Sequence, residues 1–214
     1  MPDCEAKCLL YYWECITLCL GSNKLRLLKL VKNLGKGGAV RRGMLVSRGK
    51  YLLFADADGA TTFSEIAKLN LLMSKTENED GHGLICGSRA HLASDSLATR
   101  SFFRTILMLG FHLCVSMFGC RSIQDTQCGF KLFTRNTARI VFKSCHIERW
   151  AFDVELLKIA EMLKIPMGEV SVKWTEIEGS KLDPILASIQ MFKDLFLLWL
   201  RYAIGAWKIV EKSD

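Results

Sequence analysis

Proline is scarce in this chain, with three among 214 residues, and no stretch is low in complexity or repeated. A long disordered linker has the opposite composition, rich in proline and polar residues and poor in apolar ones. Half of the residues here are hydrophobic. The sequence therefore predicts one folded domain, and its length is sufficient for a hydrophobic core.

Motifs for nucleic-acid binding are also missing. The sequence contains no RNP-like aromatic motif and no Cys/His finger, which argues against nucleic acid despite a net charge of +7. A basic, apolar chain suits another anionic partner, such as a nucleotide, a phosphorylated substrate or an anionic membrane face. None of the four histidines pairs with another at metal-ligand spacing, so we expect structural roles for them.

The nine cysteines form no paired framework. Four of them have i, i+4 spacing near the N-terminus but no histidine beside them: Cys4, Cys8, Cys15 and Cys19. A zinc cluster is one interpretation of these four, and plain apolar cysteine is the favoured one. An odd total without pairing predicts reduced thiols on a protein that faces the cytosol.

No apolar run has a clean membrane-spanning length. Leu9–Leu20 is interrupted by Glu14 and lacks the basic region of a signal peptide. Residues 101–120 and 184–207 are longer apolar segments with helical patterns. They are either core helices or helices in a membrane interface, and in the second case three aromatic residues would lie at headgroup depth. These are Trp199, Tyr202 and Trp207.

Strand and helix patterns alternate along the first half of the chain. Strands are predicted at 25–31, 51–55 and 84–88, with a helix ending near Gly49 and another at 63–74. This alternation is typical of an α/β fold with a parallel sheet. Two later elements are predicted from their periodicity, a helix at 152–164 and a strand at 167–174.

Two aspartates, Asp56 and Asp58, directly follow the apolar strand at 51–55, and Gly59 permits a tight turn after them. In an extended chain, residues i and i+2 point the same way, and ligands of open α/β sheets bind at the carboxyl ends of strands. A divalent cation that bridges to a diphosphate would relieve the repulsion between the carboxylates. The alternative is a solvated turn with two surface acids.

A glycine-rich turn opens the first helix, where Lys36 lies beside Gly35, Gly37 and Gly38. Backbone amides at a helix N-terminus favour an anion, so Lys36 and Gly37 are candidates for binding phosphate. The turn is not a P-loop, because no Ser or Thr follows the lysine. An ordinary strand-to-helix connection is the alternative.

Three arginines follow the strand at 84–88. Arg100 and Arg104 share one helix face, and residues 105–120 after them carry no charge. Together with Arg89 they mark the junction between a polar site and an apolar surface, where the phosphate of a lipid would suit. A solvated basic face is the alternative.

Six motifs carry a resemblance to a known family: "LVKNLGKGGAVRRGML", "FADADGAT", "CGSRAHL", "DTQCGFKLFTR", "ERWAFDVELL" and "WTEIEGSKL". From about Asn23 to about Val210 the chain resembles the dolichyl-phosphate β-glucosyltransferases, which are inverting GT-A glycosyltransferases of family 2. The resemblance implies a Rossmann-like, mostly parallel sheet flanked by helices, with apolar interface helices at the C-terminus. It also implies glucose transfer from UDP-glucose to dolichyl phosphate with Mg²⁺ or Mn²⁺, at the cytosolic face of the endoplasmic reticulum membrane, for N-glycan assembly.

The resemblance also assigns roles to individual residues. Asp56 and Asp58 would hold the metal and the diphosphate. The donor and its phosphates would contact Lys36, Gly37, Arg89 and Gln127. The acceptor phosphate would contact Arg100, Arg104, Ser180 and Lys181. Asp125 and Asp153 would be the catalytic acids, with Asp153 orienting the sugar or acceptor rather than taking a proton.

One departure from the family concerns the N-terminus. Family members begin with a membrane anchor and two strands that end in "P-x-Y-N-E"-like and "D-D-G-S" motifs and bind the uridine. This chain has none of these, so we expect an unmatched segment (1–22), a partial GT-A domain (23–181) and a membrane-interface helix (182–214). The expected sheet lacks its first two strands and exposes an edge.

Three readings stay open at this point. The chain is an active glucosyltransferase or a truncated, inactive copy of one; a non-catalytic scaffold on a membrane surface; or a transferase like the dolichyl-phosphate mannose synthases. The wording of "GFKLFTR" and "WTEIEGSKL" favours glucose over mannose by resemblance.

Overall fold

The computed structural model describes residues 26–89, 122–175 and 184–210. Contacts divide the chain into two units, Met1–Asn33 and Leu34–Asp214. In the described part of the first unit, the predicted strand at 25–31 is wrong, because residues 26–31 adopt no regular structure. Val31 is fully exposed there and Leu27 is half exposed. A strand forms only where a neighbour accepts its backbone hydrogen bonds, so an apolar pattern alone does not produce one.

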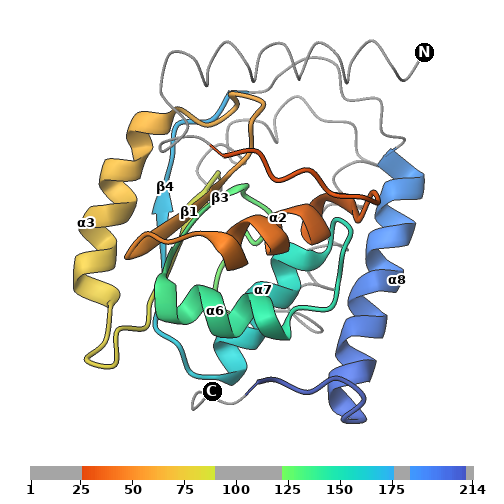
Figure 1. Cartoon of the computed structure of the whole chain (residues 1–214). Coiled ribbons are helices and arrows are strands. Elements are labelled where there is room, and N and C mark those ends of the chain that lie inside the picture. Colours follow the sequence, from red (N-terminus) through yellow and green to blue (C-terminus); the bar gives the residue numbers. More distant parts are fainter. Residues whose placement is uncertain (1–25, 90–121, 176–183, 211–214) are drawn as a thin grey trace. The chain divides into compact units, whose positions relative to one another are not determined.

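The second unit contains a sheet flanked by helices (Figure 1). The sheet has four strands in the order β1-β3-β2-β4. The strands are β1 (Tyr51–Ala55), β2 (Leu84–Ser88), β3 (Phe130–Thr134) and β4 (Met167–Ser171). Strand β3 runs antiparallel to both β1 and β2, and β4 runs parallel to β2. Strands β1, β2 and β4 share one direction, but β3 lies between β1 and β2, so two of the three strand pairs are antiparallel and one is parallel. The α/β fold is confirmed, and its sheet is mixed. Strand β3 is an element that periodicity did not predict.

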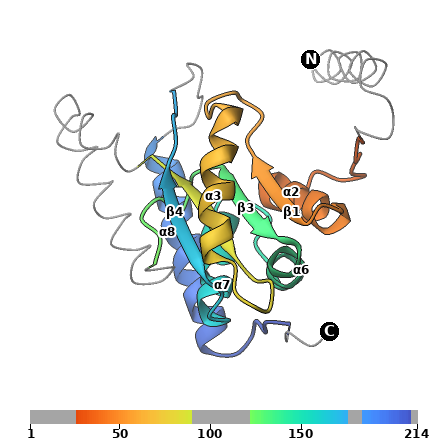
Figure 2. The same cartoon turned by 90° about the vertical axis from the view of Figure 1, so that its left-hand side faces the viewer.

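Helices cover both faces of the sheet (Figure 2). They are α2 (Gly35–Val46), α3 (Ile66–Thr76), which follows the short turn η1 (Phe63–Glu65), α6 (Arg135–Ser144), α7 (Phe152–Met162) and α8 (Pro184–Ala203). Helix α3 packs on one face, where Leu69 and Met73 meet Leu132. On the other face, α6 and α7 cover Leu84 and Phe133. Because neighbouring strand residues point to opposite faces, Leu132 and Phe133 belong to different cores.

Every residue of the central strands β2 and β3 is buried. Strands covered on both faces have near-continuous apolar sequences, and "LICGS" fits that rule. In "FKLFT", Lys131 is the exception. The described cysteines Cys86, Cys128 and Cys145 are buried free thiols, and burial raises the pKa of Cys86 to about 12 and of Cys128 to about 11. These thiols are therefore neutral packing residues.

Helix α8 is bound to the domain at its C-terminal end by the buried Glu155 of α7. The Glu155 carboxylate accepts hydrogen bonds from the Tyr202 hydroxyl at 3.0 Å and the Ile147 amide at 2.6 Å. The Trp207 ring stacks on His146 with centroids 4.5 Å apart. For Tyr202 and Trp207 the structure therefore favours the core interpretation over headgroup depth.

Another face of α8 carries exposed aromatic residues. Leu195 and Leu198 are fully buried, whereas Phe192, Phe196 and Trp199 are 40–49% exposed. Among the helices in the described ranges, none is both long enough and apolar enough to cross a bilayer. The predicted helix at 101–120 lies outside the described residues.

Candidate active site

The candidate site begins where β1 ends, at Asp56. The backbone N–H of Asp56 donates to the Gly129 carbonyl at 2.9 Å, which extends the β1–β3 ladder by one residue. The Asp56 carboxylate lies so close to Gly129 that a Cβ atom there would overlap it. A side chain at position 129 would therefore displace the carboxylate, and Gly129 is a positioning residue that sequence reasoning missed.

Lys36 supplies the positive charge at this end of the sheet. Its Nζ lies 2.8 Å from Oδ1 and 2.9 Å from Oδ2 of Asp56. The same ammonium group is 5.6 Å from the ring centroids of Phe54 and Trp150, within the range of a cation–π contact. Side-chain exposure is 27% for Lys36 and 31% for Asp56, so the pair is open to solvent on one side.

The glycines around Lys36 serve close packing. A Cβ atom on Gly37 would lie 2.7 Å from the Ile147 carbonyl oxygen and from Cβ of Phe152, and the Gly38 amide already donates to the Glu148 carbonyl at 3.1 Å. Gly35 has a φ of +72°, which favours glycine. The turn thus lets α2 approach the 147–152 segment and places Lys36 beside Asp56. Of this turn, Lys36 is the stronger candidate for a phosphate contact.

Asp58 adopts a local turn beyond the strand. Its Oδ1 accepts the Ala60 amide at 2.9 Å, as in an Asx turn, and Gly59 takes a φ of +77° to close it. Asp58 is exposed, whereas Asp56 is half-buried. The two carboxylates therefore differ in environment, with only Asp56 paired to a lysine.

Asp153 and Lys131 form a second, fully buried pair. Lys131 Nζ donates to Asp153 Oδ1 and to the Cys128 carbonyl, both at 2.6 Å, and side-chain exposure is 0% for Lys131 and 5% for Asp153. Burial raises the pKa of Asp153, opposed by the charges of Lys131 and then Lys36. In this conformation Asp153 holds Lys131, which in turn holds the loop before β3.

Arg89 follows β2 directly and forms a bidentate ion pair with Asp125. Its Nε and Nη2 donate to the two carboxylate oxygens at 2.8 Å each, and its backbone N–H adds a third bond of 2.8 Å. Burial alone would raise the pKa of Asp125, but the hydrogen bonds and charge of Arg89 outweigh it and lower that pKa. Glu169 of β4 accepts the Asp125 amide at 2.9 Å. The pair therefore braces the loop 125–129.

Topology brings these residues together. Strands β1 and β2 end at the edge where the antiparallel β3 begins, so the loop 125–129 runs from Arg89 to Asp56. Gln127 in that loop donates to the Met191 sulfur of α8 at 2.8 Å, a weak acceptor. The predicted acceptor-side residues lie outside the described residues: Arg100, Arg104, Ser180 and Lys181.

The carboxylates of Asp56 and Asp58 fit a divalent cation in part. Carboxylate oxygens are the hard ligands that Mg²⁺ and Mn²⁺ prefer, and Mg²⁺ is commonly bound by one or two carboxylates plus substrate phosphates. Within the described ranges, no three His, Cys, Asp or Glu residues gather into a metal site. The donor set therefore suits a metal that arrives with phosphate oxygens of its own.

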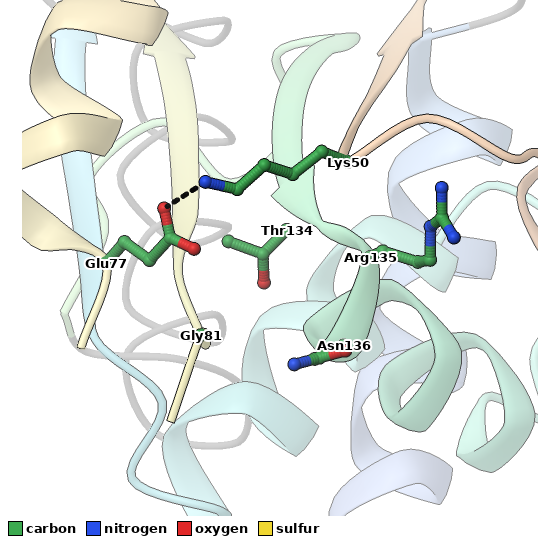
Figure 3. Close-up of a pocket in the computed structure, with 6 residues that line it drawn as sticks. All are labelled: Lys50, Glu77, Gly81, Thr134, Arg135 and Asn136. Atoms are coloured by element: carbon green, nitrogen blue, oxygen red, sulfur yellow. Dashed lines mark ion pairs between the residues drawn. The ribbon is translucent and has the colours of Figure 1, made fainter. Parts of the chain in front are cut away.

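A cavity of about 310 Å³ lies at the opposite ends of β1 and β3 (Figure 3). Most of its polar side chains already form ion pairs with each other or hydrogen bonds with the backbone. Lys50 lies 3.9 Å from Glu77, Arg135 donates to the Gly49 carbonyl, and Asn136 donates to the Asp80 carbonyl. The carboxyl end of β1 is therefore the better candidate site.

The chain is similar to known proteins over most of its length. A family model described as Glycosyl transferase family 2 matches residues 15–135. The chain is 61% identical over 197 residues to a dolichyl-phosphate beta-glucosyltransferase of Drosophila melanogaster, covering 91% of this chain and 60% of that protein. For the human protein of the same name the identity is 54% over 192 residues, covering 89% and 59%. For that of Saccharomyces cerevisiae it is 43% over 210 residues, covering 92% and 63%. The chain thus spans about 60% of the length of these relatives.

Proposed function

Because the chain belongs to glycosyl transferase family 2, we propose that it transfers glucose from UDP-glucose to dolichyl phosphate with inversion. The product is dolichyl β-D-glucosyl phosphate, a lipid-linked donor for N-glycan assembly. Relatives at 43–61% identity carry the name of this activity. The observation that carries the proposal is the position of Asp56 and Asp58 at the carboxyl end of β1, with Lys36 against Asp56.

The chemistry asks little of a general base. A phosphate monoester is already anionic near neutral pH and can attack the anomeric carbon directly, so catalysis is mainly positioning and stabilisation of the leaving diphosphate. Mg²⁺ or Mn²⁺, held by Asp56 and Asp58, would stabilise the negative charge on the leaving UDP. We propose that Lys36 contacts the same diphosphate.

Other residues of the site act by fixing the position of the loop 125–129. Arg89 and Asp125 fix one end of the loop 125–129, and Lys131 fixes its Cys128 carbonyl. Gly129 at the other end seats Asp56. A rigid loop between two strand ends keeps the donor phosphates and the metal ligands in register, which is what positioning catalysis requires.

A lipid acceptor places the reaction at a membrane surface, and we propose the cytosolic face of the endoplasmic reticulum. Helix α8 supports this through Phe192, Phe196 and Trp199, exposed at i, i+4 and i+7. Lys193 and Arg201 on the same helix are also exposed. Exposed aromatic residues with basic neighbours are typical of helices that lie in a bilayer interface.

Transfer of labelled glucose from UDP-glucose to a short-chain dolichyl phosphate in detergent, with Mn²⁺, tests the proposal. We expect lipid-soluble product that requires the metal, is abolished in Asp58→Asn and is retained in Lys50→Met. Equal product from wild type and Asp58→Asn would contradict it, and preference for a mannose donor would reassign the sugar.

A non-catalytic membrane scaffold is the second candidate, and the exposed face of α8 is the observation that favours it. It predicts liposome binding that is indifferent to Asp58→Asn and no glucosyl lipid with any metal. Replacing Phe196 and Trp199 by serine should remove liposome binding in either case, so turnover and lipid binding must be measured on the same variants.

A further inference from the structure

Lys36 makes an ion pair with Asp56 just beyond the carboxyl end of β1. Its single nitrogen contacts both carboxylate oxygens within 2.9 Å and faces the rings of Phe54 and Trp150. Other described lysine–carboxylate pairs are less symmetrical. Lys68 contacts one oxygen of Glu65 at 2.6 Å, and Lys50 approaches one oxygen of Glu77 at 3.9 Å. The Asp56 carboxylate is thus already paired at both oxygens with the Lys36 ammonium group.

Of the two partners, Lys36 is the one that can leave. The Asp56 backbone is bonded to Gly129, and its carboxylate packs against that residue's backbone. Lys36 has a flexible four-carbon stem, a solvent-exposed side and no second carboxylate contact in the described structure. A divalent cation that took the place of Nζ at the two oxygens of Asp56 would therefore displace the ammonium group.

We propose that Lys36 is an exchangeable internal cation that couples metal binding to diphosphate binding. The inference rests on the proposed function. With Lys36 in place, Asp56 and Asp58 together present one net negative charge, which attracts a lone divalent cation weakly. When a sugar nucleotide arrives with the metal, the ammonium moves from Asp56 to the diphosphate and Asp56 becomes a metal ligand.

The exchange conserves local charge. The metal brings two positive charges and the diphosphate of a sugar nucleotide two negative ones, so the site keeps its net charge of minus one throughout. Coupling of this kind is reciprocal: the diphosphate and the metal each raise the affinity of the site for the other by the same factor. Lys36 determines that factor, because it weakens binding of the metal alone and strengthens binding of the diphosphate.

Mn²⁺ binding, measured by the loss of the free-ion electron paramagnetic resonance signal, tests the inference without turnover. Wild type, Lys36→Met and Lys50→Met are titrated alone and with saturating UDP-glucose. We expect Lys36→Met to bind Mn²⁺ alone about three- to tenfold more tightly, as for a partly exposed charge pair. The enhancement by UDP-glucose should shrink by at least that factor. Lys50→Met is the matched control, since Lys50 also has a carboxylate and an aromatic ring beside it.

Two further variants separate this inference from the proposed function. Lys36→Arg keeps the charge and should retain most of the coupling. Asp58→Asn should abolish Mn²⁺ binding. Suppose that Asp58→Asn abolishes Mn²⁺ binding. If UDP-glucose then enhances Mn²⁺ binding by Lys36→Met as much as by wild type, or Lys36→Met binds Mn²⁺ alone more weakly than wild type, the exchange is wrong and the metal site stands. If Mn²⁺ binds wild type neither alone nor with UDP-glucose, or binds Asp58→Asn as tightly, the metal role itself fails and the exchange with it.

Discussion

Two lysine–aspartate pairs lie near the start of β3, and they differ mainly in burial. Lys131–Asp153 is closed to solvent, with side-chain exposures of 0% and 5%, whereas Lys36–Asp56 is open, at 27% and 31%. The contact distances are similar, at 2.6 and 2.8 Å. Desolvation determines how much stability is lost when one partner of an ion pair is removed. The two pairs should therefore differ in this loss.

The buried pair is a permanent structural contact, and the open pair is the one that we propose to be exchangeable. Lys131 also donates a hydrogen bond to the Cys128 carbonyl, so the closed pair connects α7 to the loop before β3. Lys36 can release Asp56 into water or onto a phosphate at small cost. The difference suggests that the polar chemistry of the site is carried by the open pair and its geometry is maintained by the closed one.

The largest effect on stability is expected for Lys131→Met. This change leaves the Asp153 carboxylate buried without its cation, and the free energy of unfolding should fall by about 3–5 kcal/mol. Urea denaturation followed by circular dichroism measures it. The double variant Lys131→Met with Asp153→Leu removes both charges and should recover most of the loss. An equal loss in single and double variants would contradict this structural role.

Gly129→Ala disturbs the open pair indirectly, because the Asp56 carboxylate lies against Gly129. The added methyl overlaps the Asp56 carboxylate, so we expect a loss of about 1–3 kcal/mol in unfolding free energy. Displacing Asp56, the proposed metal ligand, should reduce turnover by about a hundredfold. Gly43→Ala is the control, because a Cβ atom there meets nothing within 4 Å. Unchanged turnover in Gly129→Ala would show that Asp56 need not keep this position.

Elements with a complete local pattern were predictable from the sequence. The helix at 152–164 and the strands at 51–55, 84–88 and 167–174 were expected and are present, with the helix ending at Met162 and the last strand at Ser171. Strand β3 was missed because Lys131 interrupts its apolar run. A buried lysine is intelligible only with Asp153, 22 residues further on.

The position of the two acids was predictable, but the pairing of the candidate residues was not. Asp56 and Asp58 were expected directly after an apolar strand, and the structure has them after β1; Lys36 was a candidate on its own. That Lys36 contacts Asp56 and that Arg89 contacts Asp125 depends on packing across 20 and 36 residues. Gly129 had one available signal, a glycine immediately before a strand.

The Arg89–Asp125 pair is intermediate in burial, with exposures of 32% and 12%, and its prediction concerns pH. Since the folded-state pKa of Asp125 is lowered, its contribution is complete above the ordinary value of about 3.9. That contribution disappears as pH falls through the folded pKa. Asp125→Asn should cost about 1–2 kcal/mol near neutral pH, and the difference from wild type should vanish in acid. Urea denaturation between neutral and acidic pH measures it, and a constant difference would place the effect in packing.

The smallest effect on stability is expected for Lys36→Met. The pair is exposed on one side, so its loss should change the free energy of unfolding by less than about 1 kcal/mol. The variant loses the ammonium contacts with the rings of Phe54 and Trp150, and methionine supplies a flexible apolar side chain of similar length beside them. Urea denaturation beside Lys131→Met makes the comparison direct. If Lys36→Met destabilised the fold as strongly as Lys131→Met, the open pair would be a structural fixture, and Lys36 could not leave Asp56 at small cost.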